Sequence, residues 1–125
     1  MAKKSIKYVL LEEAYFISVD LVNTIRMYFP DFRLLAVIDS VKDLENFLQT
    51  DQISFIIADI DSNPKGFVTF MERKAPQMPV ILVSAFPEYR LFVDKINITD
   101  FLMKPVLTER LREALLKFYP SLSVI

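Results

Sequence analysis

Five short hydrophobic runs alternate along the chain with longer segments in which apolar residues recur at helical spacing. The first, third and fourth runs are nearly continuous in Val, Ile, Leu and Phe, which is typical of parallel strands buried on both faces. We therefore predict a β-strand in each run: Ile6–Leu11, Arg33–Ile38, Ile53–Ala58, Pro79–Ser84 and Thr99–Met103.

The segments between the runs predict five helices. The first covers about Phe16–Phe29 and ends before Pro30, because proline cannot continue a helix. The second begins at Ser40, whose hydroxyl can cap it together with Asp43 three residues later. The later helices are expected over Gly66–Lys74, Pro87–Lys95 and from Thr108, as N-cap, to Phe118.

Regular alternation of strand and helix predicts an α/β fold: a parallel sheet with helices on both faces and right-handed crossovers. The single glycine, Gly66, excludes both the dinucleotide-binding and the phosphate-binding glycine loops. With five strands and no nucleotide loop, we expect a doubly wound, flavodoxin-like sheet of order 2-1-3-4-5. At 125 residues the chain is expected to be a single domain, with its core at about 6–119.

The composition excludes several kinds of functional site. The chain has no Cys and no His, which excludes disulfides, thiolate and histidine zinc sites, Ser-His-Asp triads and phosphohistidine relays. Its formal net charge of −1 provides no general attraction to nucleic acid or anionic lipid. No apolar run approaches the ~18–20 residues of a membrane-spanning helix, so we expect a cytoplasmic protein that does not engage a membrane.

Polar residues follow four of the predicted strands. In an open parallel sheet, ligands bind outside the carboxyl ends of the strands, so these side chains are expected to converge. They are Glu12 and Glu13 after the first strand, Asp59 and Asp61 after the third, Ser84 at the end of the fourth, and Lys104 with Pro105 after the fifth.

This combination is typical of phosphoryl transfer. Clustered carboxylates need a cation, and oxygen ligands without His or Cys favour Mg²⁺. A magnesium ion, a lysine and a hydroxyl around one carboxylate can stabilise a transferring phosphoryl group, while the carboxylate acts as nucleophile and becomes an acyl phosphate. Each residue alone has an ordinary interpretation, as a first-turn acid, a turn residue or a solvated lysine; the prediction depends on their coincidence at strand ends.

These residues resemble the receiver domain of two-component response regulators, the CheY-like family, over about Lys7 to Phe118. Glu12-Glu13 corresponds to the acidic pair after the first strand. Three further motifs match the phosphoacceptor strand, the hydroxyl-Ala step and the last strand: Ile57-Ala58-Asp59-Ile60, Val83-Ser84-Ala85 and Asp100-Phe101-Leu102-Met103-Lys104-Pro105.

The resemblance implies that a histidine kinase, or a small phosphodonor, phosphorylates Asp59 with Mg²⁺ present. Glu13 and Asp59 would supply metal-binding carboxylates, Asp61 its backbone carbonyl, and Glu12 would act indirectly through these ligands. The domain would assist only its own phosphorylation and dephosphorylation, so it would not be an enzyme in the usual sense.

The resemblance also implies a switch. Lys104, followed by Pro105, would pair with the phosphoryl group, Ser84 would hydrogen-bond it, and Phe101 would turn inward. The face formed by helix 4, strand 5 and helix 5 would then change, altering homodimerisation or partner binding.

A finer similarity is to the receivers of LytTR-type (LytR/AlgR) regulators, in which the hydroxyl and lysine are 20 residues apart, as Ser84 and Lys104 are here. Members of that group usually carry a DNA-binding domain after the receiver. Any contact with DNA is therefore expected through an output domain that this chain, ending at Ile125, does not contain.

Departures from the family pattern leave alternatives open. Both first-strand acids are Glu, and an inward-pointing Asp61 would oppose a phosphoryl dianion, so a degenerate receiver acting as a phosphate-independent interaction module remains a hypothesis. Its anchors could be the aromatic residues near helix ends: Tyr28, Phe29, Phe86, Tyr89, Phe92 and Tyr119.

Two other classes are weaker hypotheses. A Glu followed later by Asp59-x-Asp61 resembles the toprim site of Mg²⁺-dependent nucleic-acid enzymes, but toprim would not explain Ser84 or Lys104-Pro105. An FMN carrier would share the topology, but Glu12-Glu13 would repel its phosphate.

Overall fold

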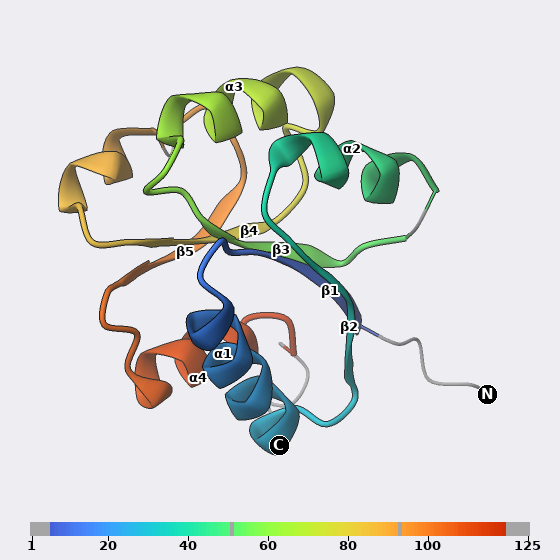
Figure 1. The fold of residues 1–125 in the computed structure, drawn as a ribbon, viewed down its shortest axis with the longest axis vertical. Coiled ribbons are helices and arrows are strands. Elements are labelled where there is room, and N and C mark those ends of the chain that lie inside the picture. Colours follow the sequence, from blue (N-terminus) through green and yellow to red (C-terminus); the bar gives the residue numbers. More distant parts are fainter. Residues whose placement is uncertain (1–5, 51, 93, 120–125) are drawn as a thin grey trace.

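The computed structural model describes residues 6–50, 52–92 and 94–119, which form one parallel five-stranded sheet between two layers of helices (Figure 1). The strand order is β2-β1-β3-β4-β5, as the sequence predicts. The strands are β1 (Ile6–Leu11), β2 (Phe32–Ile38), β3 (Phe55–Asp59), β4 (Val80–Ser84) and β5 (Ile98–Met103).

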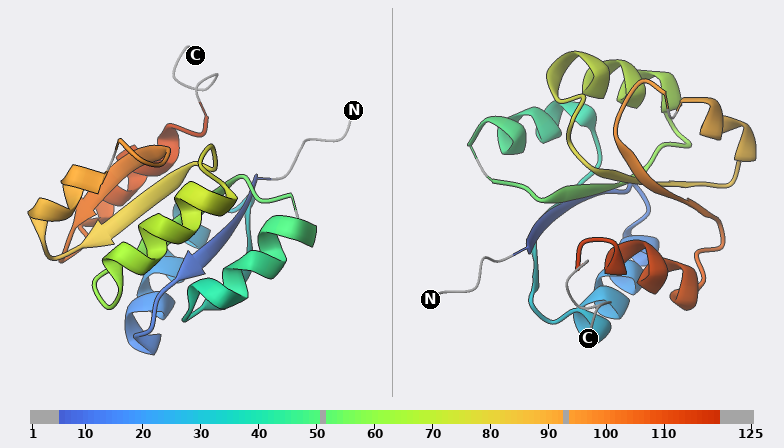
Figure 2. Two further views of the ribbon diagram at one scale, coloured as in Figure 1. Left: turned by 90° about the horizontal axis from the view of Figure 1, so that it is seen from above. Right: turned by 180° about the vertical axis from the view of Figure 1, so that it is seen from behind.

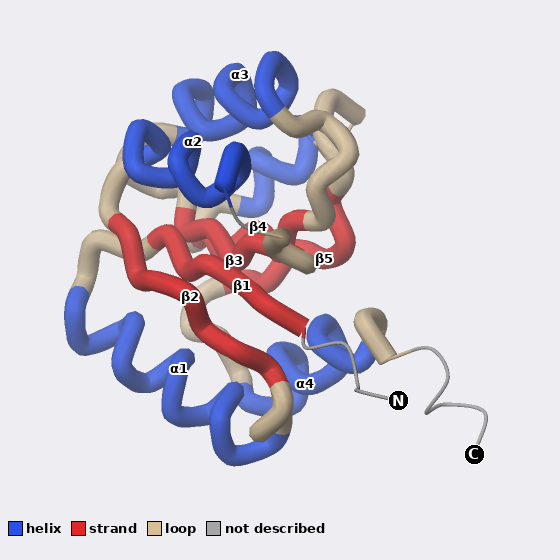
Figure 3. The backbone as a smooth tube through the Cα atoms, turned by 90° about the vertical axis from the view of Figure 1, so that its right-hand side faces the viewer, coloured by secondary structure: helices blue, strands red, loops and turns tan. Residues whose placement is uncertain are grey.

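Helices cover both faces of the sheet (Figures 2 and 3). α1 (Tyr15–Tyr28) and α4 (Thr108–Leu116) lie on one face, and α2 (Val41–Thr50) and α3 (Pro64–Lys74) lie on the other. A short 3₁₀ helix, η1 (Pro87–Phe92), connects β4 towards β5. Within the described part of the chain, no helix has the length and apolar character needed to cross a membrane.

Successive residues of the central strands alternate between two buried cores, because side chains along a strand point to opposite faces. On one face, Leu10, Ile57 and Ile81 pack among residues of α1 and α4, such as Ile25 and Leu115. On the other face, strand residues pack among residues of α2 and α3: Val9, Ile56 and Leu82 lie with Leu44, Phe67 and Met71. Burial on both faces is the reason that the strands are continuous hydrophobic runs.

Local hydrogen bonds set the start of α2 but not that of α4. The backbone N–H of Asp43 donates to Ser40 Oγ at 3.4 Å, and Ser40 Oγ donates to the Asp43 carboxylate at 3.2 Å, which confirms the predicted capping pair. The prediction of Thr108 as an N-cap is wrong: Leu107 is the N-cap of α4, Thr108 is its first helical residue, and no side chain caps this end.

The fourth predicted helix, Pro87–Lys95, is also different in the structure. Only Pro87–Phe92 is helical, with 3₁₀ geometry, and Val93 lies outside the described residues. Phe86 and Leu91 are exposed, so this segment does not bury the apolar face from which most helices gain their stability. β3 is shorter than expected as well, because Ser54 precedes it and uses its hydroxyl to accept a hydrogen bond from the Lys7 N–H.

Candidate functional site

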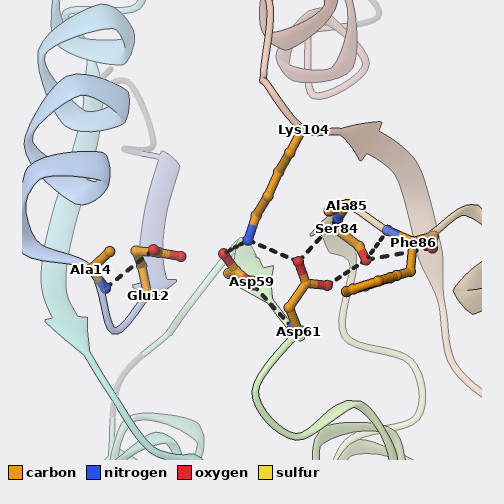
Figure 4. Close-up of polar contacts among 8 residues, drawn as sticks. All are labelled: Glu12, Ala14, Asp59, Asp61, Ser84, Ala85, Phe86 and Lys104. Atoms are coloured by element: carbon orange, nitrogen blue, oxygen red, sulfur yellow. Dashed lines mark hydrogen bonds and ion pairs between the residues drawn. The ribbon is translucent and has the colours of Figure 1, made fainter.

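The ends of β3, β4 and β5 bring a carboxylate, a hydroxyl and a lysine together. Asp59 is the last residue of β3, Ser84 the last of β4, and Lys104 directly follows β5. The strand register sets Asp59 beside Val83 and Ser84 beside Met103, so the three positions lie at one edge of the sheet. Figure 4 shows Lys104 directed at Asp59 and at Asp61, and the Ser84 hydroxyl directed at Asp61.

Lys104 bridges two carboxylates. Its Nζ lies 2.5 Å from Asp59 Oδ2 and 2.9 Å from Asp61 Oδ2. The lysine backbone is fixed as well, because its N–H donates to the Ser84 carbonyl at 2.9 Å. Burial by itself would lower the pKa of Lys104, but the hydrogen bonds and negative charges of the two aspartates outweigh it and raise the pKa. The ammonium group is therefore held in its charged form.

Asp61 turns its carboxylate into the site. It accepts hydrogen bonds from Ser84 Oγ at 2.5 Å and from the Ala85 N–H at 3.0 Å, in addition to the contact with Lys104. Its own N–H donates to Asp59 Oδ1 at 3.0 Å. Burial opposes ionisation, but the hydrogen bonds from Ser84, Lys104 and Ala85 dominate and lower the pKa of Asp61. This carboxylate is ionised and has three donors.

Ser84 is fully buried, and its hydroxyl contacts the backbone of Phe86. Its Oγ accepts a hydrogen bond from the Phe86 N–H at 2.9 Å while it donates to Asp61. The hydroxyl is thus oriented by the chain that follows β4. Phe86 itself is partly exposed and packs its ring near that of Tyr89, with 5.5 Å between centroids.

On the other side of Asp59 lies a hollow of about 220 Å³, lined by four acids. Glu12 is buried there at 6% exposure, whereas Glu13 is exposed. Burial, followed by a hydrogen bond and charge repulsion from Asp59, raises the pKa of Glu12 to about 7. The fourth acid is Asp39, directly after β2, which our sequence analysis missed. Applying the strand-end rule to the second strand would have found it.

The chemistry of this hollow fits Mg²⁺ in its donors, which are all oxygens. Of the residues that the structure describes, however, no three acids are arranged to ligate one ion together. Mg²⁺ needs only one or two carboxylates and retains several waters, so the donor set is sufficient for an ion held mainly by Asp59 and a neighbouring glutamate.

The remaining two predicted site residues lie on β5 and just after it. Phe101 is buried at 7% exposure, and the guanidinium of Arg90 lies 5.0 Å from its ring centroid. Pro105 follows Lys104 through a cis peptide bond and lines a groove of about 500 Å³ with Ile17 of α1.

The strand order and the helical layers define a fold class: the fold is that of the CheY-like receiver domains of response regulators. One similar solved structure is the response regulatory domain of protein mrkE from Klebsiella pneumoniae, 18% identical with a TM-score of 0.80 over 96% of this chain and 100% of that chain. A signal receiver domain of two-component signal transduction (histidine kinase) from Clostridium thermocellum is 20% identical, with a TM-score of 0.75 over 91% and 97% of the two chains.

A third is the isolated REC domain of RcsB from Salmonella enterica serovar Typhimurium, solved in the presence of the phosphomimetic BeF3-. It is 12% identical, with a TM-score of 0.77 over 93% of this chain and 89% of that chain. No family model and no curated protein matches this sequence. The neighbours confirm the predicted fold class; they do not show a special closeness to LytTR-type regulators.

Proposed function

We propose that this chain is a two-component signal receiver that accepts a phosphoryl group on Asp59. The observation that carries the proposal is the contact of Lys104 Nζ with Asp59 Oδ2 at 2.5 Å, with the buried Ser84 hydroxyl and the Ala85 N–H at the same strand ends. An ammonium, a hydroxyl and an amide N–H are the donors that a phosphoryl dianion on this carboxylate requires.

In the proposed reaction, one Asp59 carboxylate oxygen attacks the phosphorus of the donor. A new P–O bond forms as the donor's bond to phosphorus breaks, and the donor's nitrogen or oxygen leaves with the electron pair. The donor is a phosphohistidine of a histidine kinase or a small acyl phosphate. Lys104 stabilises the charge on the transferring group, so the chain acts as a substrate that assists its own modification rather than as an enzyme with turnover.

Mg²⁺ is part of the proposal and would neutralise charge between Asp59 and the incoming phosphoryl group when bound. The residues proposed to hold it are Asp59 and Glu13 through carboxylates and Asp61 through its backbone carbonyl. Glu12 acts indirectly, through these ligands. The support is the acidic hollow beside Asp59, which both glutamates line.

The proposed output is a change in the face made by η1, β5 and α4, with Ser84 and Phe101 as the switch residues and Pro105 holding the turn after Lys104. Two contacts support this. The guanidinium of Arg90 in η1 lies over the ring of Phe101 on β5, and the Lys104 N–H donates a hydrogen bond to the Ser84 carbonyl. The face would control a partner, a homodimer or a DNA-binding output domain. A cytoplasmic location and the relation to LytTR-type receivers belong to the same proposal.

A phosphate-independent interaction module is the second candidate. One observation favours it. The Asp61 carboxylate already accepts hydrogen bonds from Ser84, Ala85 and Lys104, the donors that a phosphoryl group would need. In that case the receiver fold would signal by binding alone.

The two candidates are distinguished by intact mass spectrometry of the protein after incubation with acetyl phosphate, with and without Mg²⁺, beside Asp59→Asn. We expect one phosphoryl adduct that requires both Asp59 and Mg²⁺. Absence of an adduct, both with acetyl phosphate and with phosphorylated histidine kinases, would contradict the acceptor function and favour the interaction module.

A further inference from the structure

The Asp61 carboxylate makes three contacts with groups that come from two other strands. Ser84 Oγ and the Ala85 N–H donate to it from the end of β4, and Lys104 Nζ donates from the end of β5 (Figure 4). These donors span 23 to 43 positions of sequence separation from Asp61. The contacts therefore depend on the assembled sheet rather than on the local turn alone.

The backbone explains why Asp61 lies there. β3 and β4 pair with Asp59 beside Val83, and the Ile60 N–H extends the ladder by donating to the Val83 carbonyl at 3.3 Å. This register brings Asp61 level with Ala85. The turn then closes, because the Asn63 N–H donates to the Ile60 carbonyl at 3.1 Å.

The same three donors surround the proposed phosphoryl site. Lys104 Nζ contacts Asp59 and Asp61 at once, so a single ammonium group balances two carboxylates. Phosphorylation replaces the single negative charge of the Asp59 carboxylate by about 1.5 to 2 negative charges on the phosphoryl group. A phosphoryl group on Asp59 and the Asp61 carboxylate cannot both occupy these donors. Ser84 Oγ and the Ala85 N–H each have a single proton, which is already donated to Asp61, and the two anions repel each other.

We propose that Asp61 is an internal anionic ligand of the phosphoryl-binding donors, and that its carboxylate must leave Ser84, Ala85 and Lys104 before a phosphoryl group on Asp59 can bind them. The inference rests on the proposed acceptor function and deepens it. Asp61 would limit phosphorylation through its side chain, independently of any role of its backbone carbonyl.

The test uses Asp61→Asn, which removes the charge and keeps the shape, and Asp61→Ala, which removes all three contacts. The matched control is Asp20→Asn, which removes one negative charge from exposed Asp20 on α1, beside the groove that Lys104 lines. Each variant is incubated with acetyl phosphate and Mg²⁺, and the phosphorylated fraction is followed by intact mass. The backbone amide of Ala85 is followed by NMR without a phosphodonor.

We expect Asp61→Asn and Asp61→Ala to be phosphorylated roughly tenfold faster than wild type, because an ionised carboxylate no longer has to be displaced from its donors on the way to the product. Asp20→Asn should match wild type. In Asp61→Ala the Ala85 amide proton should shift upfield and exchange faster with solvent, since it loses its acceptor.

Equal phosphorylation rates in wild type and both Asp61 variants would overturn the inference while leaving Asp59 as acceptor. An unchanged Ala85 amide in Asp61→Ala would overturn it as well. If no variant gains an adduct but the Ala85 amide changes, the acceptor function fails and the occupation of these donors by Asp61 stands.

Discussion

At the scale of single residues, the site combines groups whose charges depend on one another. Asp61 is held ionised by its donors, whereas Glu12, buried against Asp59, holds its proton to about pH 7. The two acids differ in protonation because Asp61 accepts hydrogen bonds from several donors, whereas Glu12 is buried and lies near the negative charge of Asp59.

This difference predicts a pH dependence of stability. The pKa of Glu12 is raised from 4.5 to about 7, so the folded state binds this proton more tightly than the unfolded chain does. The free energy of unfolding should therefore fall as pH rises from about 4.5 to 7, by up to about 3 kcal/mol at 1.36 kcal/mol per pKa unit. Urea unfolding across this range, without divalent cations, measures it.

Glu12→Gln should remove this contribution, because the amide does not titrate. The variant's stability should then change less with pH than that of wild type between about 4.5 and 7. Parallel pH profiles for the two proteins would contradict the interpretation of Glu12 as the titrating group.

The sequence could indicate which residues gather at the site, because the strand-end rule depends only on strand positions and sheet topology. It could not establish the direction of the Asp61 side chain. That direction depends on the β3–β4 register and on the turn that Asn63 closes. Asp39 was missed because the rule was applied to four of the five strands.

At the scale of elements, the buried strands were predictable and the fourth helix was not. Continuous hydrophobic runs gave β1 and β4 to within one residue, since burial on both faces leaves a strong pattern. The segment from Pro87 has polar and apolar residues at helical spacing, but with Leu91 left exposed it forms only a 3₁₀ helix. Helical periodicity does not reveal whether an apolar face has a surface to cover.

Besides apolar packing, the carboxylate of Asp100 links β5 to the region of α4. Asp100 accepts from Arg110 Nη2 at 3.0 Å, from Lys117 Nζ at 2.9 Å and from the Phe101 N–H at 2.8 Å. Burial opposes ionisation, but these hydrogen bonds outweigh it and lower the pKa of Asp100. The carboxylate therefore links the strand that carries Phe101 to the helix behind it.

We expect Asp100→Asn to lower the free energy of unfolding by about 0.5–1.5 kcal/mol at neutral pH, a modest value because both cations are partly exposed. Chemical denaturation measures the change. The matched variant Glu113→Gln removes an exposed partner of Arg110 at 2.8 Å and should cost close to nothing. Equal losses in the two variants would argue against a special role of Asp100.

At the scale of the whole molecule, the candidate site and much of the aromatic packing lie at opposite ends of the sheet. The site lies at the carboxyl ends of the strands, whereas aromatic rings gather near the amino ends. Phe118 stacks on Phe55 with 4.2 Å between centroids, and Tyr119 lies 5.0 Å from Phe32 and donates a hydrogen bond to the Asp31 carboxylate.

This separation predicts that stability and phosphorylation can be changed independently. Phe118→Ala should cost about 2–3 kcal/mol of unfolding free energy, below the value for a fully buried phenylalanine because the ring is only partly buried. Phosphorylation of the folded protein by acetyl phosphate should be unchanged at a temperature well below the midpoint of unfolding. Leu116→Ala, at an exposed position of α4, is the control and should cost little.

A slower phosphorylation of folded Phe118→Ala would show that the two ends of the sheet are coupled. Circular dichroism before and after the reaction would confirm that the folded state is the one being measured.

The three hydrogen bonds to Asp61 also bear on how strongly such a receiver could respond. With a carboxylate already on these donors, phosphorylation exchanges one anion for another instead of filling an empty site. The free energy available to shift the switch is then only the difference between two competing ligands. Reversing a population from 1:99 to 99:1 requires about 5.5 kcal/mol, so this exchange favours a narrow dynamic range.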